Sequence, residues 1–336
     1  MEYRICTQCV MDTTAQEIEF DSEGVCNFCH QAQASLKEVW NSRPPSIPAG
    51  NEYDVLIGLS GGVDSSFLLH KAVELGIKPL CFSVDTGYNK PEADENIMKL
   101  VEGLKVPFIR YTIDLQAFRS LQAAFLKAGV RNVEIPTDHV LMAVSLELAK
   151  RYKIKTVLSG GNVNTESIMP PSWGANARDL THIKAIAKRF DSSLKSLPTC
   201  SLWEWNWHRW VLSTRTVYLL DYFGYNRAEA EALLIQKYAY VSTGEKHEEN
   251  YFTWWFQNFY LFEKFNIDKR KAHYSSMINS GQMTRAEAMF KLTASPIYPQ
   301  LGLEKKVLSY PKRDHEFYPM DKWYGRISKL IKYIYG

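Results

Sequence analysis

One stretch of the sequence combines a glycine turn with hydroxyl groups and a carboxylate: Ser60-Gly61-Gly62-Val63-Asp64-Ser65-Ser66. It follows the apolar, β-prone run 53–59, and a helical pattern continues from it to residue 75. A tight turn between a strand and a helix aims unpaired backbone N–H groups and the positive end of the helix dipole at one point, which suits a phosphate. The alternative is a plain tight turn in which Asp64 and Ser65 only cap the helix.

No lysine closes this turn, unlike the Gly-Lys-Ser/Thr of a Walker A loop. A bound phosphate would therefore need cations from a metal ion or from elsewhere in the chain. Asp64 is a candidate Mg²⁺ ligand, because one or two carboxylates commonly hold Mg²⁺ together with phosphate oxygens. Lys246 and Lys269 are candidate phosphate cations, since each stands in a polar cluster beside a helix of the last third. Solvated charges at helix ends are the alternative.

A second glycine turn, Ser159-Gly160-Gly161-Asn162, repeats the first about ninety residues later. In an open parallel sheet the ligand binds where the strand order reverses, beyond the carboxyl ends of two adjacent strands. The two turns therefore predict one nucleotide site between the first and fourth strands, and Glu166 is a second candidate Mg²⁺ ligand. An ordinary strand-to-helix turn is the alternative.

The elements that must position these motifs alternate along the chain. We expect strands at 53–59, 79–84, 107–113 and 155–159, and helices at 65–75, 92–104, 115–128 and 138–152. This alternation predicts an α/β fold with a doubly wound parallel sheet. The proline-rich stretch 41–51 is a linker, so we expect an N-terminal unit over 1–45, the sheet domain over 50–200 and a mainly helical domain over 201–336. For the tryptophan-rich run 202–210 we expect a strand or an aromatic platform, with buried packing favoured over base stacking.

Four of the six cysteines form two C-x2-C pairs near the N-terminus, Cys6/Cys9 and Cys26/Cys29. This spacing predicts a structural Zn²⁺ site that supplies the folding energy of a segment too short for its own core. Reduced cysteines without a metal, or an iron–sulfur cluster, are the alternatives.

The composition is that of an ordinary soluble protein, with 336 residues, 46% apolar and 23% charged. A net charge of +3 does not argue for nucleic acid as a partner. The sequence has no apolar run of membrane-spanning length and no signal-peptide pattern at its start, so we expect a cytoplasmic protein without membrane insertion.

Two further sets of residues are candidate contacts for a small polar ligand. Asp85 ends the second predicted strand, where it suits a sugar hydroxyl or a turn. The loop 168–182 follows the second glycine turn and could cover a polar substrate such as a sugar with its Trp173, Asn176, Asp179 and His182. An anchor in the core is the alternative for Trp173.

The motifs together resemble the N-acetyl sugar amidotransferases of bacterial surface-polysaccharide biosynthesis. SGGVDSS alone resembles the PP-loop of the ATP pyrophosphatases, which cleave ATP to AMP and pyrophosphate. The likeness extends over nearly the whole chain through four further motifs. These are the cysteine pairs, SGGN, KHEE followed by FTWWFQ, and DKRKAH followed by SGQMTRAEA. The family usually has a serine and an arginine after the KHxE glutamate, where this chain has Asn250 and Tyr251.

The resemblance implies the synthetase half of a glutamine-dependent pair, which converts an acetamido group of a nucleotide-activated sugar to an acetamidino group. ATP would adenylate the acetamido oxygen, and ammonia would then displace AMP. The implied cofactors are ATP, Mg²⁺ and structural Zn²⁺. The implied partners are a separate glutaminase and a barrel-type subunit that conducts ammonia, because this chain shows no glutaminase motif and position 2 is Glu2.

The resemblance also implies roles for individual residues. The residues implied in ATP binding are Ser60, Gly61, Gly62, Val63, Asp64, Ser65, Ser66, Asp85, Gly160, Gly161 and Asn162. The residues implied in catalysis are Asp64, Lys246, His247, Glu249, Lys269 and Arg270. The residues implied in substrate binding are Trp173, Asn176, Asp179 and His273.

Two other functions stay open on the sequence. A PP-loop enzyme that modifies tRNA would need a sulfur-carrying cysteine near the nucleotide and a basic surface, whereas Cys81 lies in a predicted strand and Cys200 far along the chain. A non-catalytic ATP-binding module is the other, and Asp64 together with the lysine-rich C-terminal third argues against it.

Overall fold

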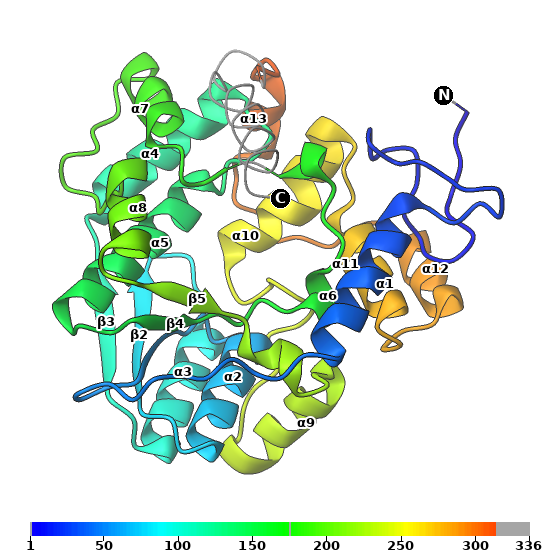
Figure 1. Ribbon diagram of the computed structural model, residues 1–336. Helices are drawn as coiled ribbons and strands as arrows, with labels where there is room; N and C mark the ends of the chain where they lie inside the picture. Colours follow the sequence, from blue (N-terminus) through cyan, green and yellow to red (C-terminus); the bar gives the residue numbers. More distant parts are fainter. Residues whose placement is uncertain (1, 175, 314–336) are drawn as a thin grey trace.

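The computed structural model describes residues 2–174 and 176–313, and Figure 1 shows an open sheet enclosed by helices. The sheet is parallel throughout and has the strand order β3-β2-β1-β4-β5. Its strands are β1 (Val55–Gly58), β2 (Pro79–Asp85), β3 (Phe108–Thr112), β4 (Thr156–Leu158) and β5 (Arg215–Val217). The predicted fold class is confirmed, and the sheet has one strand, β5, that the sequence did not indicate.

The strand order reverses at β1, which pairs with β2 on one side and β4 on the other. Both glycine turns follow these central strands, so the sheet brings them to one edge. Side chains alternate along β1. Val55 and Ile57 pack into one hydrophobic cluster and Leu56 into the other, as expected for a strand that is buried on both faces.

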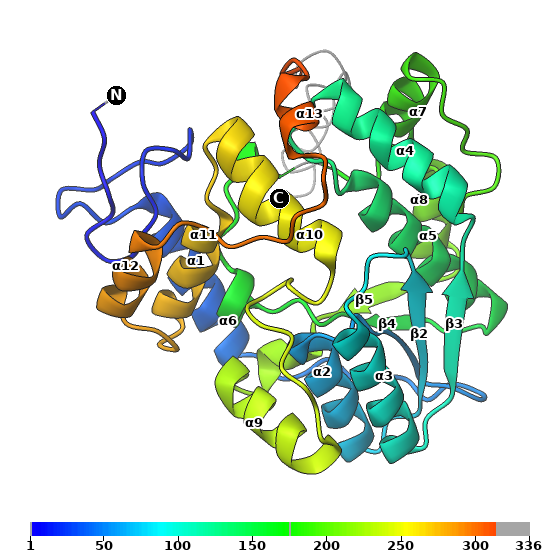
Figure 2. The same cartoon turned by 180° about the vertical axis from the view of Figure 1, so that it is seen from behind.

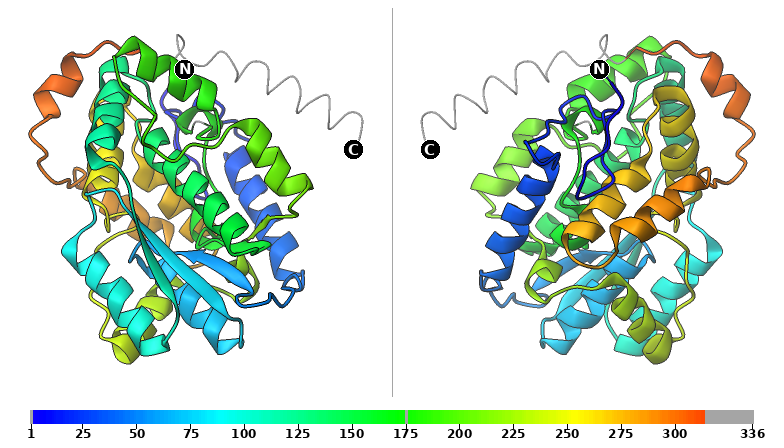
Figure 3. Two further views of the ribbon diagram at one scale, coloured as in Figure 1. Left: turned by 90° about the vertical axis from the view of Figure 1, so that its left-hand side faces the viewer. Right: turned by 90° about the vertical axis from the view of Figure 1, so that its right-hand side faces the viewer.

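Helices cover both faces of the sheet. Figures 2 and 3 show one layer that contains α2, α3 and α9, and an opposite layer that contains α4, α5, α7 and α8. Their bounds are α2 Val63–Glu74, α3 Pro91–Leu104, α4 Leu115–Ala128, α5 Ile135–Arg151, α6 Val163–Glu166, α7 Leu180–Arg189, α8 Leu202–Trp210 and α9 Arg227–Tyr238. The predicted helices agree with α2 to α5 to within three residues at either end.

The tryptophan-rich run is a helix, α8, and the expectation of a strand with buried packing is wrong. Ser201 and Glu204 form a complete capping box at its N-terminus, which selects the helix over a strand. Trp203 and Trp210 are about three-quarters exposed.

The last third begins where the chain leaves α9 and crosses over the end of the sheet. Backbone hydrogen bonds fix this crossing beside β2, from Lys90 N–H to the Glu249 carbonyl at 2.9 Å and from Tyr251 N–H to the Tyr88 carbonyl at 2.8 Å. Helix α10 (Tyr251–Trp255) then continues as a π-helical segment, Phe256–Lys264, and α11 (Lys269–Asn279), α12 (Arg285–Thr293) and α13 (Glu304–Ser309) follow. This crossing carries the KHEE residues over the two glycine turns.

The N-terminal cysteine segment and α1 (Asn27–Trp40) pack beside α11 and α12, as Figures 1 and 2 show. The Gln8 amide donates to the Asn279 side-chain oxygen at 2.8 Å, and Val10 N–H donates to Ser275 Oγ at 3.2 Å. The Arg285 guanidinium donates to the carbonyls of Cys9 and Cys6, both at 3.0 Å. The cysteine segment is therefore hydrogen-bonded directly to α11 and to the start of α12.

Within the described residues, no helix combines the length and the apolar character needed to cross a membrane.

Candidate active site

The first glycine turn leaves the N-terminus of α2 without a side-chain cap. Gly62 is the N-cap residue, and the Ser65 hydroxyl donates to the Gly62 carbonyl at 3.3 Å instead of accepting from a helix N–H. Gly61 has φ +79°, and a Cβ there would lie 2.2 Å from the Ala93 carbonyl oxygen, so the turn requires glycine. The alternative that Asp64 and Ser65 merely cap α2 is wrong, because neither caps it.

The second glycine turn lies directly against the first. A Cβ on Gly160 would come within 3.1 Å of the Ser65 nitrogen. The helix after this turn, α6, is already capped, since Asn162 accepts from Thr165 N–H at 3.0 Å and Asp221 accepts from Val163 N–H at 2.7 Å. At the sheet reversal, α6 therefore begins with side-chain caps and α2 begins without one.

A cavity of about 440 Å³ opens at this point, a size typical of small-molecule sites. The predicted residues that line it are Ser60, Gly62, Val63, Asp64, Ser65, Gly160, Gly161, Glu166, Lys246, His247 and Glu249. Gly61 turns away against Ala93, Ser66 is buried within α2, and Asn162 caps α6, so these three shape the cavity without lining it.

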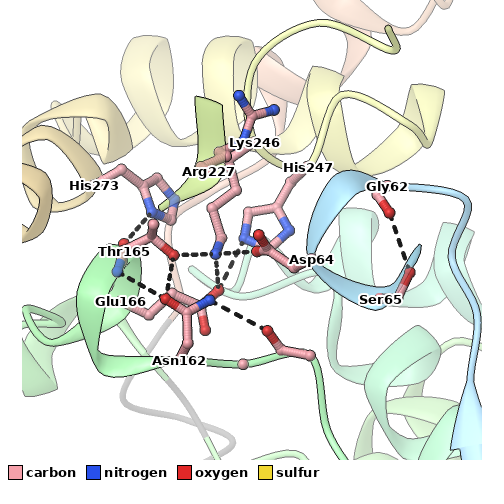
Figure 4. A network of polar contacts seen from close by, with 12 residues as sticks. Gly62, Asp64, Ser65, Asn162, Thr165, Glu166, Arg227, Lys246, His247 and His273 are labelled. Carbon is pink, nitrogen blue, oxygen red and sulfur yellow. Dashed lines mark hydrogen bonds and ion pairs between the residues drawn. The ribbon is translucent and has the colours of Figure 1, made fainter. Parts of the chain in front are cut away.

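Lys246 lies at the centre of the polar contacts in this cavity (Figure 4). Its Nζ lies 2.6 Å from Asp64 Oδ2 and 2.9 Å from Glu166 Oε1, and it donates to Thr165 Oγ1 at 2.7 Å. One ammonium thus bridges two carboxylates that each follow a glycine turn and lie about a hundred residues apart in the sequence. The first glycine turn has no lysine of its own, and Lys246, from the segment that crosses the end of the sheet, lies beside it.

Electrostatics hold this cluster in its charged form. Burial alone would raise the pKa of Glu166, yet Lys246 and His247 hold it well below its usual range. Burial would likewise lower the pKa of Lys246, but Asp64 and Glu166 raise it above the ordinary value. His247 Nε2 lies 3.5 Å from the same Glu166 oxygen, and its backbone is in the left-handed region at φ +66°. Such strain in a non-glycine residue costs about 1–3 kcal/mol and is common at functional sites.

The role of Asp64 and Glu166 as Mg²⁺ ligands stays a prediction, and the structure shows how the two carboxylates lie. Both carboxylates already converge on one cation, the Lys246 ammonium, beside the uncapped start of α2. Oxygen ligands from one or two carboxylates plus phosphate are what Mg²⁺ prefers.

Two acidic residues in the cavity were missed by sequence reasoning. Glu134, the residue before α5, is buried, and burial together with the charge of Asp138 raises its pKa to about 8. Its Oε2 accepts from Thr253 Oγ1 at 2.7 Å, whereas its Oε1 has no partner among the described residues. The Asp138 side chain lines the cavity and is exposed to the water in it. The protein atoms packed around its carboxyl group still restrict its hydration, which raises its pKa to about 6.

The sequence around these two residues did not indicate that they line a cavity. Asp138 stands in the first turn of a helix, where an acidic side chain is common and does not by itself indicate a site. Glu134 precedes Pro136 in a stretch without periodicity, and only the tertiary fold shows that the cavity wall surrounds it.

Three other predicted residues lie behind Lys246. Lys269 and His273, with Arg270, line a smaller cavity that adjoins the main one. Burial lowers the pKa of Lys269 to about 8, and its Nζ contacts Met169 Sδ at 3.0 Å, so of the two candidate lysines it is Lys246 that lines the main cavity. Arg270 is held by a two-pronged ion pair with Asp268.

The remaining predicted contacts are placed elsewhere. Trp173 is 3% exposed and anchors its loop in the core, Asp179 caps α7 by accepting from His182 N–H at 3.0 Å, and Asn176 accepts from Arg178 N–H within the loop. Asp85 accepts from Gly87 N–H at 2.9 Å in a turn. None of these four side chains lines the main cavity, and their contact with a ligand stays a prediction.

The four N-terminal cysteines come together as one fully buried group. Their Sγ atoms all lie within 4.8 Å of one another, with 3.7 Å between Cys9 and Cys26. A tetrahedral Zn²⁺ with Zn–S bonds of about 2.3 Å separates its sulfurs by about 3.8 Å, so the group fits a single ion. A multi-iron cluster would hold the four sulfurs further apart, because several atoms would lie between them.

Residues 249–319 match the model of the family described as LPS biosynthesis protein WbpG-like, C-terminal domain. The family recognised from the motifs is thereby supported over the segment that follows the KHEE residues. The chain matches no curated protein.

The solved structures that are similar to this chain include the following three. NMN synthetase from Francisella tularensis is 15% identical over 66% of this chain and 88% of its own, with a TM-score of 0.30. NH3-dependent NAD synthetase from Campylobacter jejuni subsp. jejuni is 18% identical over 50% and 72%, with a TM-score of 0.28.

The third structure is the U34-tRNA thiolase NcsA from Methanococcus maripaludis, solved with its [4Fe-4S] cluster. It is 14% identical over 92% of this chain and 97% of its own, with a TM-score of 0.38. At these TM-scores the likeness carries no argument about function, and the fold assignment rests on the strand order described above.

Proposed function

We propose that this protein is an ATP-dependent amidotransferase of surface-polysaccharide biosynthesis, which converts an acetamido group of a nucleotide-activated sugar to an acetamidino group. The observation that carries the proposal is the uncapped start of α2 at the sheet reversal, facing two carboxylates and a lysine. The match of residues 249–319 to the WbpG-like family supports the pathway, and the chemistry below supports the reaction.

The phosphates of ATP would lie on the N-terminus of α2, where the helix dipole and unpaired N–H groups favour negative charge. Asp64 and Glu166 would hold Mg²⁺, which would supply positive charge to the leaving pyrophosphate. Lys246 supplies a second, permanent cation on the same side of the cavity. These groups position ATP and neutralise charge, which is the main task of a protein in this type of transfer.

An acetamido group needs activation because its carbonyl is a poor electrophile and oxide is a poor leaving group. Transfer of AMP to the acetamido oxygen converts that oxygen to a phosphate ester, which ammonia can then displace. The side chain of Glu134 suits this substrate, since a neutral carboxylic acid with a free oxygen can donate a hydrogen bond to an amide group at neutral pH. His247 and Glu249 line the same cavity and would orient the reacting groups.

Ammonia would come from a separate glutaminase acting with a barrel-type subunit that conducts it. The cofactors of the proposed reaction are ATP and Mg²⁺, with Zn²⁺ in the cysteine group as a structural element. A sulfur-transfer reaction is less well supported, because Cys81 and Cys200 are both buried and neither lines the main cavity.

The direct test is a screen of N-acetylated nucleotide sugars for conversion of ATP to AMP in the presence of ammonium chloride. AMP should appear with one acetamido sugar and not with its deacetylated form. The variant Asp64→Ala should lose turnover while keeping its fold, measured by circular dichroism. Formation of ADP, or near-normal turnover in Asp64→Ala, would contradict the proposal.

A further inference from the structure

Two further hollows beside Lys246 are not used by the reaction described so far. A partly enclosed chamber of about 50 Å³ lies between α11 and the segment 245–248, and a groove of about 480 Å³ beyond it is open to the surface. The main cavity and the chamber share Arg227 and Lys246 as lining residues. The chamber and the groove share Arg227, Glu245, Glu248 and Met277. The three hollows therefore adjoin in sequence, from the surface to the reaction cavity.

The size of the chamber limits what can occupy it. A single water needs about 10–15 Å³ of such volume, so the chamber takes one or a few molecules of that size and excludes a nucleotide or a sugar. Ammonia has the size of water, whereas the other proposed reactants do not. The chamber is thus selective by size for the smallest reactant.

The chamber also contains a buried acceptor aimed at such a molecule. His273 is 9% exposed and lines the chamber, and its Nε2 has no hydrogen-bond partner among the described residues. Its Nδ1 lies 3.5 Å from the Thr165 carbonyl oxygen. Burial, together with His247, Lys246 and Lys269, holds the pKa of His273 well below its usual range, so the imidazole is neutral. A neutral imidazole with a free nitrogen accepts a hydrogen bond from an N–H group.

Charges along the path differ between its outer and inner ends. At the outer junction Glu248 has no ion pair within the described residues, whereas Glu245 is paired with Lys291 at 2.7 Å. At the inner end stand Lys246, Lys269 and Arg270. The Glu248 carboxylate attracts ammonium to the mouth, whereas Lys246 and Arg270 are already ion-paired with carboxylates, so the inner end carries no unpaired charge from these two residues. Figure 4 shows His273 on the side of Lys246 away from the first glycine turn.

We propose that this groove and chamber form the route by which ammonia reaches the reaction cavity, with His273 as the acceptor that holds it. The proposal rests on the proposed function, which makes ammonia the nucleophile. Ammonium loses one N–H bond at the mouth, and its proton passes to the Glu248 carboxylate and from there to water in the groove. Neutral ammonia then moves past Met277 into the chamber, and on past Lys246 to the adenylated oxygen.

The test blocks the junction between groove and chamber. Met277 lines both hollows and is only partly buried, so Met277→Trp should narrow the path with little cost to folding. The expected result is a rise in the apparent KM for ammonium chloride of at least about tenfold, which corresponds to about 1.4 kcal/mol. Exchange of labelled pyrophosphate into ATP, driven by the acetamido sugar without ammonia, should be unchanged. The matched control is Met98→Trp on the surface of α3, which should leave both quantities unchanged.

A second variant keeps the test decisive if Met277→Trp does not fold. Glu248→Gln should raise the apparent KM for ammonium chloride and leave pyrophosphate exchange unchanged. If exchange is intact and the KM for ammonium is unchanged in the variants that fold, the chamber is only a void, and the route is wrong. If wild-type protein shows no exchange with any acetamido sugar, the proposed function itself fails.

Discussion

The variant Glu134→Gln tests whether the cavity holds a neutral carboxylic acid at physiological pH. Glutamine has the same shape as protonated glutamate and does not titrate, so the variant keeps the contact with Thr253 and removes only the ionisation. The pKa of Glu134 is about 8 in the folded protein, against an ordinary value of 4.5.

The sign of the effect follows from proton binding. Above pH 4.5 the unfolded chain has lost this proton, whereas the folded protein keeps it until about pH 8, so the folded state binds more protons and its stability falls as the pH rises. Each pH unit is worth about 1.4 kcal/mol, so the wild type should lose about 2 kcal/mol between pH 6.5 and pH 8 from this group. The window begins above the pKa of Asp138, about 6, and so avoids most of its titration.

The measurement is the free energy of unfolding in urea at pH 6.5 and pH 8 for both proteins. Glu134→Gln should lose about 2 kcal/mol less than the wild type over this window. Glu147→Gln is the matched control, because Glu147 lies on α5 as well but is exposed, and it should keep the wild-type pH dependence. Identical pH dependence in Glu134→Gln and wild type would refute a neutral Glu134.

Three further predictions concern the turn, the lysine and the cysteines. Lys246→Met should lower kcat by at least about 100-fold and lower the free energy of unfolding by about 3 kcal/mol, because it leaves Asp64 and Glu166 without their shared cation. A smaller loss of activity in Lys246→Met than in Lys269→Met would contradict the role given to Lys246. Gly61→Ala should abolish ATP binding measured by calorimetry, since its Cβ cannot fit the turn, and normal affinity would be inconsistent with the geometry. Cys6→Ser should lower the bound zinc measured by mass spectrometry, and an unchanged zinc content would rule out the four-cysteine site.

The centre of the sheet was predictable because β1 and β2 are apolar, buried runs and because glycine turns follow β1 and β4. The runs before Ser60 and Ser159 gave β1 and β4, and their similar endings indicated that they are neighbours, which the strand order confirms. Strand β5 escaped prediction because it is three residues long and two of them are exposed. A strand this short forms only because a neighbouring strand, here β4, provides its hydrogen-bond partners. The sequence does not show which strand that is.

Site residues within a local motif could be predicted from the sequence. Site residues that reach the cavity only through tertiary packing could not. The glycine turn before Asp64 follows from the sequence, and the need for a remote lysine follows from what that turn lacks, whereas the absence of a side-chain cap on α2 is known only from the structure. The choice of Lys246 over Lys269 depends on how the chain crosses the end of the sheet. The exclusion of Trp173 and the inclusion of Glu134 likewise depend on which side chains the core and the cavity enclose.

The central claim is that the acetamido oxygen of a sugar becomes an oxygen of AMP. The most direct measurement labels the acetamido carbonyl of the accepted sugar with ¹⁸O and analyses the products by mass spectrometry after turnover with ATP and ammonia. The account predicts that AMP carries the label and that the sugar has lost it. Unlabelled AMP, with the label retained in the sugar or released to water, would contradict it.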